Sequence, residues 1–449
     1  MSAAPRETRR KALPAALACA LLCAAVVLGE RAMCARLERW DVLARDETLF
    51  DADPESRLRG LAHNWLRNVT IAHPNFGHFF ATPIRALAGA AHALSLAPGD
   101  DQERTRDAIG LWVAPLAAGA KTACLFGLAW LLGMGWIRAT LLAAVGALSF
   151  SQLLFGCLPE TYGPSGLALA LAYLLLALDL RRGREPRWPA WLAVGVLTTG
   201  ITITNVAAVA LLFLFATRAA GRPLGSSILR TTGFGALCLS INAVLALAGN
   251  LAYGQPVDLA RELAHKSTHA AGSSPAFAGR MAALPGALAD TFAPPAPIAG
   301  YIPDPSDEAM CIRVLELPSD PAPRATWLGL AVLALILAGA LLTFAARGPW
   351  RTLGSASLAV LAFNAALHAG WGSAPFLYSQ HWHLSALVLL AIPLAAGERL
   401  KRPRTAALAL LALALAVHNA ALARDVSEKL RAGPLYRDCS SVPSDERLR

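Results

Sequence analysis

The chain has 449 residues, of which 55% are hydrophobic and only 16% are charged, and its mean hydropathy is +0.47. Soluble domains carry about 25% charged residues, so this composition excludes an ordinary soluble protein. The net charge of +10 does not indicate a nucleic-acid partner, because the basic residues fall in short clusters between apolar runs. The eight cysteines show no CxxC or zinc-finger spacing.

The first apolar run follows a basic arm. The arm RETRRK precedes ALPAALACALLCAAVVLG, which is similar to a signal peptide, but many apolar runs follow it, so we predict an uncleaved helix over residues 12–30. The positive arm should stay in the cytoplasm. Five Lys among 40 basic residues, with abundant Ala, indicate a GC-rich bacterial genome. We therefore predict a multi-pass protein of the bacterial inner membrane with a cytoplasmic N-terminus.

Residues 31–107 are polar and charged, apart from a weaker apolar patch at 78–96. If this patch crossed the membrane, the cluster RRGREPR at 181–187 would face outward, against the preference of basic loops for the cytoplasm. We therefore predict an external first loop that bears an interfacial amphipathic helix at this patch.

Apolar runs of about 20 residues, enough to cross the hydrocarbon of a bilayer, recur along the rest of the chain. Residues 188–217 can form one long tilted helix or two short helices. We predict two, breaking near Gly200, because one helix would invert every later loop. The fold class is then an all-α polytopic bundle of about 11 transmembrane helices. The remaining spans are predicted at 108–132, 138–157, 163–180, 228–253, 326–346, 353–372, 379–397 and 404–422.

The order of apolar runs and polar segments divides the chain into three parts: an N-terminal membrane module (1–253), an external Pro/Gly-rich loop (254–325), and C-terminal membrane helices with an external tail (326–449). The loop includes FAPPAPIAGYIPDPSDE, which is too rich in turn residues for a continuous helix. Three cysteines lie in external segments, where a disulfide is permitted but its pairing stays open. They are Cys34, Cys311 and Cys439.

Polar side chains gather on the predicted outer side of the membrane. Glu160 and Tyr162 lie in the short loop LPETYG between two apolar runs, where a connector without function would need only small residues. Acids, cations and imidazoles at one water–lipid boundary are suited to a lipid with a charged headgroup. The other predicted members of this site are Asp51, Asp53, Arg57, His73, Asn205, Gln380 and His381.

Each of these groups also has a purely structural explanation. Asp51 or Asp53 can cap the helix that follows it, and Glu160 can cap the next apolar helix. His381 and His383 are two residues apart and point about 200° from each other on a helix, so we do not expect them to chelate one ion.

Four segments occur in a distinctive order: LFDAD…R…HPNF after the first helix, then LPETYGPSGLALALAYLLL, GITITN and LYSQHWHLSALVLLAIPL. This order resembles the GT-C class of membrane glycosyltransferases, which includes protein mannosyltransferases and lipid A aminoarabinose transferases. The resemblance implies a sugar donor on a polyprenyl phosphate, an acidic catalytic residue in the first external loop, and interfacial helices in that loop. The resemblance covers roughly residues 10–220 and 370–395.

Carried over to this chain, the resemblance assigns the first-loop acid to Asp53 or, as the alternative, to Asp51. His73, in the pair HP, matches the opening of the second interfacial helix, and Glu160 matches a second acid beside a tyrosine. The Asp-Glu pair usual in the first loop also has a counterpart at 46–47, so the identity of the base stays open among these acids.

On this interpretation, the protein moves a sugar from a polyprenyl-phosphate donor to an acceptor on the periplasmic face, with inversion. Asp53 takes or orients the proton of the acceptor. Glu160 and Tyr162 bind sugar hydroxyls or hold a cation; a divalent ion is compatible with the class, but no motif predicts one. The groups expected to stabilise the leaving phosphate are Arg57, Arg59, Gln380 and His381.

Two other functions fit a polytopic membrane protein. One is a transporter or flippase, which would carry ionisable residues inside its spans. Lys121 is the main such residue here. The other is a non-catalytic membrane protein. The sequence does not indicate an oligomeric state.

Overall fold

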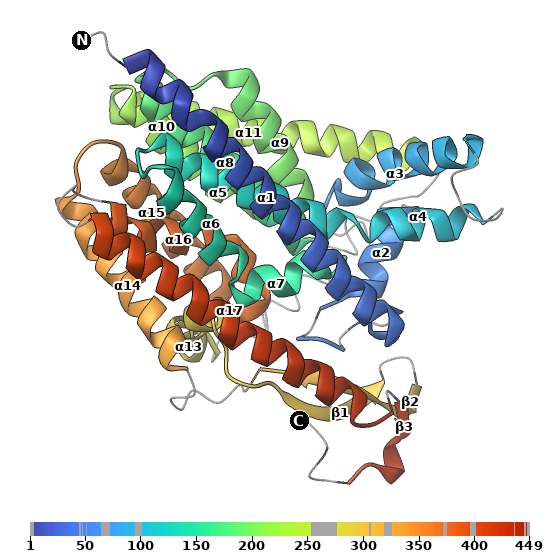
Figure 1. Ribbon diagram of the computed structural model, residues 1–449. Helices are drawn as coiled ribbons and strands as arrows, with labels where there is room; N and C mark the ends of the chain where they lie inside the picture. The colour runs from blue at the N-terminus through green and yellow to red at the C-terminus, as the bar shows by residue number, and fades with distance from the viewer. Residues whose placement is uncertain are drawn as a thin grey trace.

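The protein is a bundle of long helices that carries a small antiparallel sheet at one end (Figure 1). The sheet was not expected from the sequence. The computed structural model describes residues 4–44, 46, 48–50, 52–63, 72–94, 101–252, 276–304, 307–317, 326–370, 375–395, 401–434, 436–443 and 446.

The chain up to residue 252 is helical throughout its regular elements. These are α1 (Ala4–Arg39), η1 (Val42–Ala44), α2 (Pro54–His63), α3 (Phe76–Ala93), α4 (Gln102–Gly110), α5 (Val113–Leu131), α6 (Trp136–Ala147), α7 (Phe150–Cys157), α8 (Tyr162–Arg182), α9 (Trp188–Ile201), α10 (Asn205–Ala219) and α11 (Leu224–Ala252). The second half adds three strands. Its elements are α13 (Ala276–Asp290), β1 (Ile298–Asp304), β2 (Asp307–Glu316), α14 (Trp327–Ala345), α15 (Pro349–Gly370), η3 (Pro375–Tyr378), α16 (Ser379–Ala395), α17 (Lys401–Arg431), β3 (Tyr436–Asp438) and η4 (Cys439–Ser441).

Among the described residues, seven helices are long and apolar enough to cross a membrane. They are α1, α4 continued by α5, α8, α11, α14, α15 and α17. An eighth span results if α6 and α7 are counted as one, and α9 and α10 are shorter apolar helices. The protein is therefore a polytopic helical membrane protein, and the larger number of eleven spans stays a prediction.

The first helix is longer than its apolar run. We predicted that it ends at residue 30, but α1 continues to Arg39. The extension ERAMCARLER contains neither Gly nor Pro and consists mainly of good helix formers, so nothing in it stops the helix. As a result, Glu30 lies inside α1 rather than at its end.

The predicted span 138–157 is bent by 66° between α6 and α7. Ser149, at the bend, donates its hydroxyl proton to the carbonyl of Gly146 at 2.7 Å. The first N–H groups of α7 have partners outside the helix: the N–H of Phe150 donates to the carbonyl oxygen of Phe292 at 3.1 Å, and that of Ser151 to the carbonyl oxygen of Thr291 at 2.9 Å. Because the orphan donors of a new helix are satisfied in this way, the break costs little free energy.

The two predicted short helices in 188–217 are confirmed: α9 ends at Ile201 and α10 begins at Asn205. The patch predicted as an interfacial helix forms α3, which extends sideways from the bundle next to α4 (Figure 1). The predicted external loop 254–325 contains α13 and the hairpin of β1 and β2 within its described part.

The helix α16 forms the centre of the bundle and packs against α8, α14 and α15. Its residues are buried on nearly all sides, as expected for a helix that is apolar all round. The contact with α14 is made backbone to backbone, because a Cβ atom at Gly339 would overlap the carbonyl oxygen of Leu389. Small residues allow this close approach between membrane helices.

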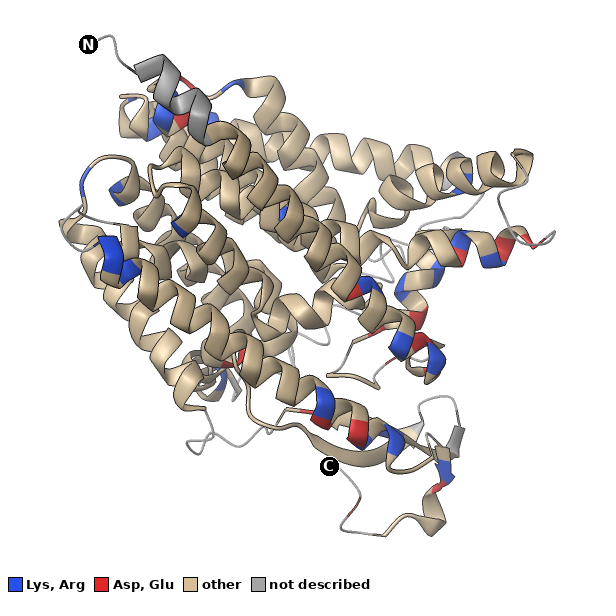
Figure 2. Cartoon of the chain, in the orientation of Figure 1, with Lys and Arg blue, Asp and Glu red and all other residues tan. Residues whose placement is uncertain are grey.

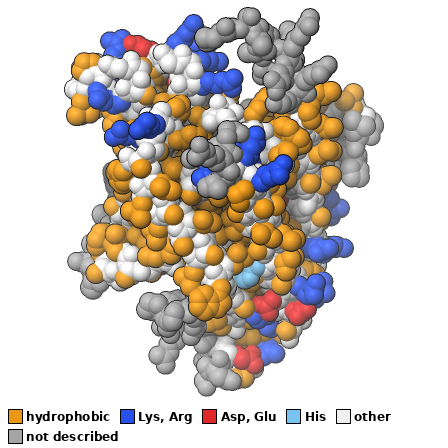
Figure 3. Space-filling view, turned by 60° about the vertical axis from the view of Figure 1, so that its left-hand side comes forward, with side chains coloured by type: hydrophobic (Ala, Val, Ile, Leu, Met, Phe, Trp, Pro, Cys, Tyr) orange, Lys and Arg blue, Asp and Glu red, His pale blue; other side chains and the backbone are white. Residues whose placement is uncertain are grey.

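The two ends of the bundle differ in charge (Figure 2). Arginines gather at the end where α1 starts, where Arg181 and Arg182 close α8 and Arg218 closes α10. We call this the basic end. Most of the acidic residues lie toward the opposite end. Hydrophobic side chains cover the middle of the face shown in Figure 3, with charged side chains above and below them, as on a protein surrounded by lipid.

The opposite end, which we call the sheet end, carries β1, β2 and β3 in that order, all antiparallel. A disulfide joins Cys311 of β2 to Cys439 of η4, whereas Cys34 is free and buried. The sheet also holds the chain that follows α1. The N–H of Phe50 donates to the carbonyl of Leu315 in β2 at 2.8 Å, which fixes the segment leading into α2.

Candidate functional site

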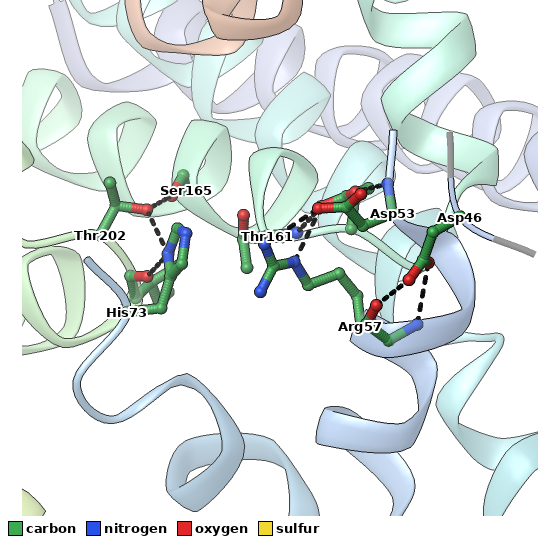
Figure 4. A network of polar contacts seen from close by, with 10 residues as sticks. Asp46, Asp53, Arg57, His73, Thr161, Ser165 and Thr202 are labelled. Carbon is green, nitrogen blue, oxygen red and sulfur yellow. Dashed lines mark hydrogen bonds and ion pairs between the residues drawn. The ribbon is translucent and has the colours of Figure 1, made fainter. Parts of the chain in front are cut away.

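Two segments that are far apart in the sequence meet at the sheet end. The N–H of Asp53, just before α2, donates to Oε1 of Glu160, between α7 and α8, at 2.5 Å. Arg57, one turn into α2, links the two carboxylates (Figure 4). Its Nη2 lies 3.3 Å from Oδ2 of Asp53, and its Nε lies 3.7 Å from Oε2 of Glu160.

The start of α2 explains how Asp53 and Arg57 come to share one face. Pro54 occupies the first position of the helix, where its missing N–H costs nothing. Asp46 accepts the N–H of Ser56 at 3.0 Å, which supplies the cap at this end. Side chains four residues apart lie one above the other on a helix. Asp53 therefore forms an ion pair with Arg57 across one helical turn. Asp51 lies outside the described residues.

Glu160 is almost completely buried, with 2% of its surface exposed. Its Oε2 also accepts the N–H of Thr161 at 2.9 Å. Burial raises the pKa of Glu160 from 4.5 to about 7, although Arg57 and the two N–H groups oppose this shift. Burial alone would lower the pKa of Arg57. The negative charges of Glu160 and Asp53 outweigh this effect and raise the pKa of Arg57 above its ordinary value. Arg57 therefore stays charged, while Glu160 titrates near neutral pH.

Tyr162 connects this ion cluster with the start of α16. Its ring centroid lies 6.0 Å from that of Tyr378 and 5.9 Å from that of His381. His381 is buried, and its Nδ1 lies 3.3 Å from Nε2 of His368. The structure thus brings Asp53, Glu160 and the segment around 378–381 close together at the sheet end, and their role as one site stays a prediction.

His73 lies on the other side of Thr161 from Arg57 (Figure 4). Its Nδ1–H donates to the carbonyl of Ile201 at 2.7 Å, and Nδ1 lies 3.4 Å from Oγ1 of Thr202. The hydroxyl of Thr202 is in turn 2.7 Å from that of Ser165 in α8. His73 therefore links the first loop to the break between α9 and α10.

Backbone hydrogen bonds complete this contact. The N–H of Asn75 donates to the carbonyl of Gly200 at 2.9 Å, and the N–H of Ile203 donates to that of Ala72 at 2.9 Å. The motif HPNF thus docks on the motif GITITN. No local signal in the sequence predicts this contact, because His73 and Ile201 are 128 residues apart in the chain.

Gln380 and Lys121 belong to a second, deeper network. The ammonium nitrogen of Lys121 lies 2.5 Å from Oε1 of Gln380 and 2.6 Å from Nδ1 of His383. Nε2 of His383 is 2.8 Å from the hydroxyl of Ser149. All four side chains are buried. Gln380 therefore does not reach Arg57, and His383 and His381 enter different networks, as their spacing predicted.

Two other predicted residues lie apart from the ion cluster. Asn205, the first residue of α10, is 1% exposed, and neither polar atom of its amide has a hydrogen-bond partner among the described residues. Arg59 pairs with Glu55 instead. It lines a cavity of about 790 Å³ between the end of α1, α2 and α4, together with the carboxylates of Glu38, Asp41, Glu103 and Asp107.

One buried acid was missed by the sequence analysis. Glu30 of α1 is 4% exposed, and a Cβ atom at Gly156 of α7 would lie 2.7 Å from its carboxyl carbon. Gly156 therefore leaves the space that the Glu30 side chain fills, four residues before Glu160. In the sequence, the signal for a buried acid was an acidic residue at the edge of an apolar run. The predicted end of helix 1 at that residue concealed it.

The arrangement can bind an anion or transfer a proton. Within the described residues, no group of three or more His, Cys, Asp or Glu side chains is placed to hold a metal ion. Between Asp53 and Glu160, the positive charge is supplied by Arg57. Comparisons of the chain with protein-family models, with curated proteins and with solved structures gave no match.

Proposed function

We propose that the protein is an integral membrane glycosyltransferase of the GT-C type, which moves a sugar from a polyprenyl phosphate to an acceptor at the sheet end. The observation that carries the proposal is the meeting of Asp53, Arg57 and Glu160. These groups come from two of the segments that carry the family resemblance. The hydrogen bond between Asp53 and Glu160 joins residues that are 107 positions apart in the chain.

The exposure of Asp53 and the burial of Glu160 suit them to different roles in the proposed reaction. The side chain of Asp53 is 38% exposed, so it can meet an acceptor and take its proton during in-line attack on the anomeric carbon. Arg57 can stabilise the charge that develops on the leaving phosphate. Glu160, almost fully buried, holds Arg57 in place. Inversion follows from a single displacement.

The location of the site also supports a lipid-linked donor. Arginine-rich loops at the basic end favour a cytoplasmic orientation for that end, and this supports a sheet end at the periplasmic surface of a bacterial inner membrane. A donor whose lipid tail lies in the bilayer would present its phosphate at that surface. The proposed partners are therefore the polyprenyl-phosphate sugar and the bilayer.

The test uses the full-length protein in nanodiscs with a panel of polyprenyl-phosphate sugars, and it measures donor binding and release of polyprenyl phosphate. We expect Asp53→Asn to lower turnover at least 100-fold while donor binding is kept, because general-base catalysis contributes about 10² to 10⁴. Glu55→Gln, on the same helix, is the matched control and should keep full turnover. Full activity of Asp53→Asn and of variants at the three alternative candidates for the base, Asp46, Glu47 and Asp51, would overturn the proposal.

One observation favours transport as the second candidate. Lys121 and Glu30 are ionisable groups buried within helices that can span the membrane, a feature typical of transporters. In proteoliposomes, a flippase would move a fluorescent lipid-linked sugar between leaflets without cleaving it. Cleavage without translocation supports the enzyme, and translocation without cleavage supports the transporter.

A further inference from the structure

The strand β2 lies in the middle of the sheet, and two different segments occupy one of its edges. β1 covers the other edge, because its residues from Ile298 to Ile302 pair with Glu316 to Ile312. β3 pairs with residues 310–312, and Leu49 of the first loop forms a parallel bridge with Leu315. The C-terminal segment and the first loop are therefore neighbours along the same edge of β2.

A disulfide and a few hydrogen bonds hold the C-terminal segment on the sheet. The disulfide joins Cys311 of β2 to Cys439, 128 residues later in the chain. The hydroxyl of Tyr301 donates to the carbonyl oxygen of Pro434 at 2.9 Å, and its N–H donates to the carbonyl oxygen of Glu446 at 2.9 Å. A disulfide between distant residues removes much conformational freedom from the chain, so we expect its reduction to release this segment.

The first loop is held on β2 in an unusual backbone conformation. The N–H of Leu315 donates to the carbonyl oxygen of Thr48 at 3.0 Å, and the N–H of Phe50 donates to that of Leu315 at 2.8 Å. Phe50 has a φ of 54°, in the left-handed region that residues other than glycine rarely adopt. Its ring packs edge-on against Phe150, with 5.6 Å between the centroids. Such a conformation persists only where the surrounding contacts impose it.

The segment held in this way leads directly into the ion cluster. The N–H of Ala52 donates to the carbonyl oxygen of Leu49 at 3.0 Å, which closes a turn immediately before Asp53. The N–H of Asp53 then donates to Oε1 of Glu160 at 2.5 Å. The contact between Asp53 and Glu160 therefore depends on the position of Phe50, three residues before Asp53.

We propose that the disulfide at the sheet end is a redox switch for the contact between Asp53 and Glu160. This inference rests on the proposed transferase activity. In the oxidised protein, the C-terminal segment keeps this edge of β2 paired, and β2 holds Phe50. In the reduced protein, the C-terminal segment leaves, the neighbouring pairing of the first loop is lost, and Phe50 relaxes to an ordinary conformation. Asp53 then moves away from Glu160, and the site is inactive.

The chemistry of the switch is thiol–disulfide exchange with a dithiol. Cys439 is partly exposed, whereas Cys311 is 1% exposed, so a thiolate of the reductant attacks Sγ of Cys439. The S–S bond breaks, and Cys311 leaves as a thiolate and takes up a proton. The second thiol of the reductant then displaces Cys439, so the reductant ends as a disulfide and the protein gains two electrons and two protons. A disulfide oxidant reverses these steps, so the site would become active only in an oxidising compartment.

The test uses the full-length protein in nanodiscs in three states: oxidised, reduced with dithiothreitol, and reoxidised with glutathione disulfide. We expect reduction to lower kcat about 10- to 100-fold, because a displacement of about 1 Å in a site can cost that much, and reoxidation to restore it. Cys439→Ser should have the low kcat without any reductant. Cys34→Ala is the matched control and should respond to the reductant as the wild type does, because Cys34 forms no disulfide.

A second measurement does not depend on turnover. Amide hydrogen exchange should become faster at Phe50 and Asp53 in the reduced protein, whereas exchange in α16 should stay slow because the core of the bundle is kept. Unchanged exchange at Phe50 after complete reduction overturns the switch, and so does an equal acceleration in α16, which would indicate general unfolding. An unchanged kcat after complete reduction also overturns the switch but leaves the proposed function standing. Lack of transfer by the oxidised wild type overturns the proposed function itself, together with the switch.

Discussion

Arg57 places one positive charge between two carboxylates, one half-exposed and one buried. Arg57→Met would leave Glu160 without its cation inside the protein. We expect the free energy of unfolding to fall by about 2 to 3 kcal/mol, less than for a fully buried pair. Thermal unfolding in detergent measures this loss. Arg59→Met is the control, because its exposed pair with Glu55 should contribute less than about 1 kcal/mol. Equal losses would contradict a special role for Arg57.

The pKa of Glu160 predicts how stability depends on pH. The folded protein raises this pKa from 4.5 to about 7, so it holds the proton more tightly than the unfolded chain does. The resulting stability is complete below about pH 4.5 and is lost as the pH rises through about 7. We expect the melting temperature of the wild type to fall more steeply over this range than that of Glu160→Gln. Parallel curves for the two proteins would show that the pKa is not raised.

The sequence predicted part of this site, and the reasons are physical. Asp53 and Glu160 stood out because a carboxylate at a membrane boundary is costly and needs a partner. The partner of Gln380 could not be predicted, because its contact with Lys121 depends on how α5 and α16 are rotated against each other. The His368–His381 contact was hidden for the same reason. Side-chain partners across helices follow from packing, which a single sequence does not specify.

At the scale of elements, Gly200 holds α3 against the break between α9 and α10. A Cβ atom at Gly200 would overlap the ring of Phe79 in α3 and Oδ1 of Asn242 in α11. We expect Gly200→Ala to lower the free energy of unfolding by about 1 to 3 kcal/mol, the usual effect of overpacking, and to speed amide hydrogen exchange in α3. Gly233→Ala in α11 is the matched control. A Cβ atom at Gly233 would have no atom of the described residues within 4 Å, so this substitution should cost nothing. Slow exchange of α3 in both variants would contradict the docking.

The helices themselves were more predictable than their breaks. Long apolar runs left little choice for the positions of the spans, because about 20 residues are needed to cross the hydrocarbon. The break near Gly200 followed from the length of 188–217. The bend between α6 and α7 could not be predicted, because the carbonyls of Thr291 and Phe292 that stabilise it come from a distant segment. The hairpin of β1 and β2 was missed since its Pro and Gly residues indicated only turns.

At the scale of the whole molecule, two independent features give the same orientation. Arginine clusters at the basic end favour the cytoplasm. The disulfide at the sheet end would persist only in an oxidising compartment such as the periplasm. The ion cluster of Asp53, Arg57 and Glu160 lies with the disulfide, at the end joined to β2 through Phe50. We therefore expect the site to face the periplasm.

This orientation predicts the oxidation state of each cysteine in intact cells. With the sheet end in the periplasm, Cys311 and Cys439 should be joined and the other six cysteines should be free. Denatured protein from cells whose thiols were blocked at once should therefore gain two alkylation tags after reduction. Cys311→Ser is the control, because it frees Cys439 and should gain none. If the sheet end faced the cytoplasm, glutathione and thioredoxin would keep both thiols reduced, and no tag would be gained in the wild type either. That result would place the candidate site on the wrong side for a donor presented at the periplasmic surface.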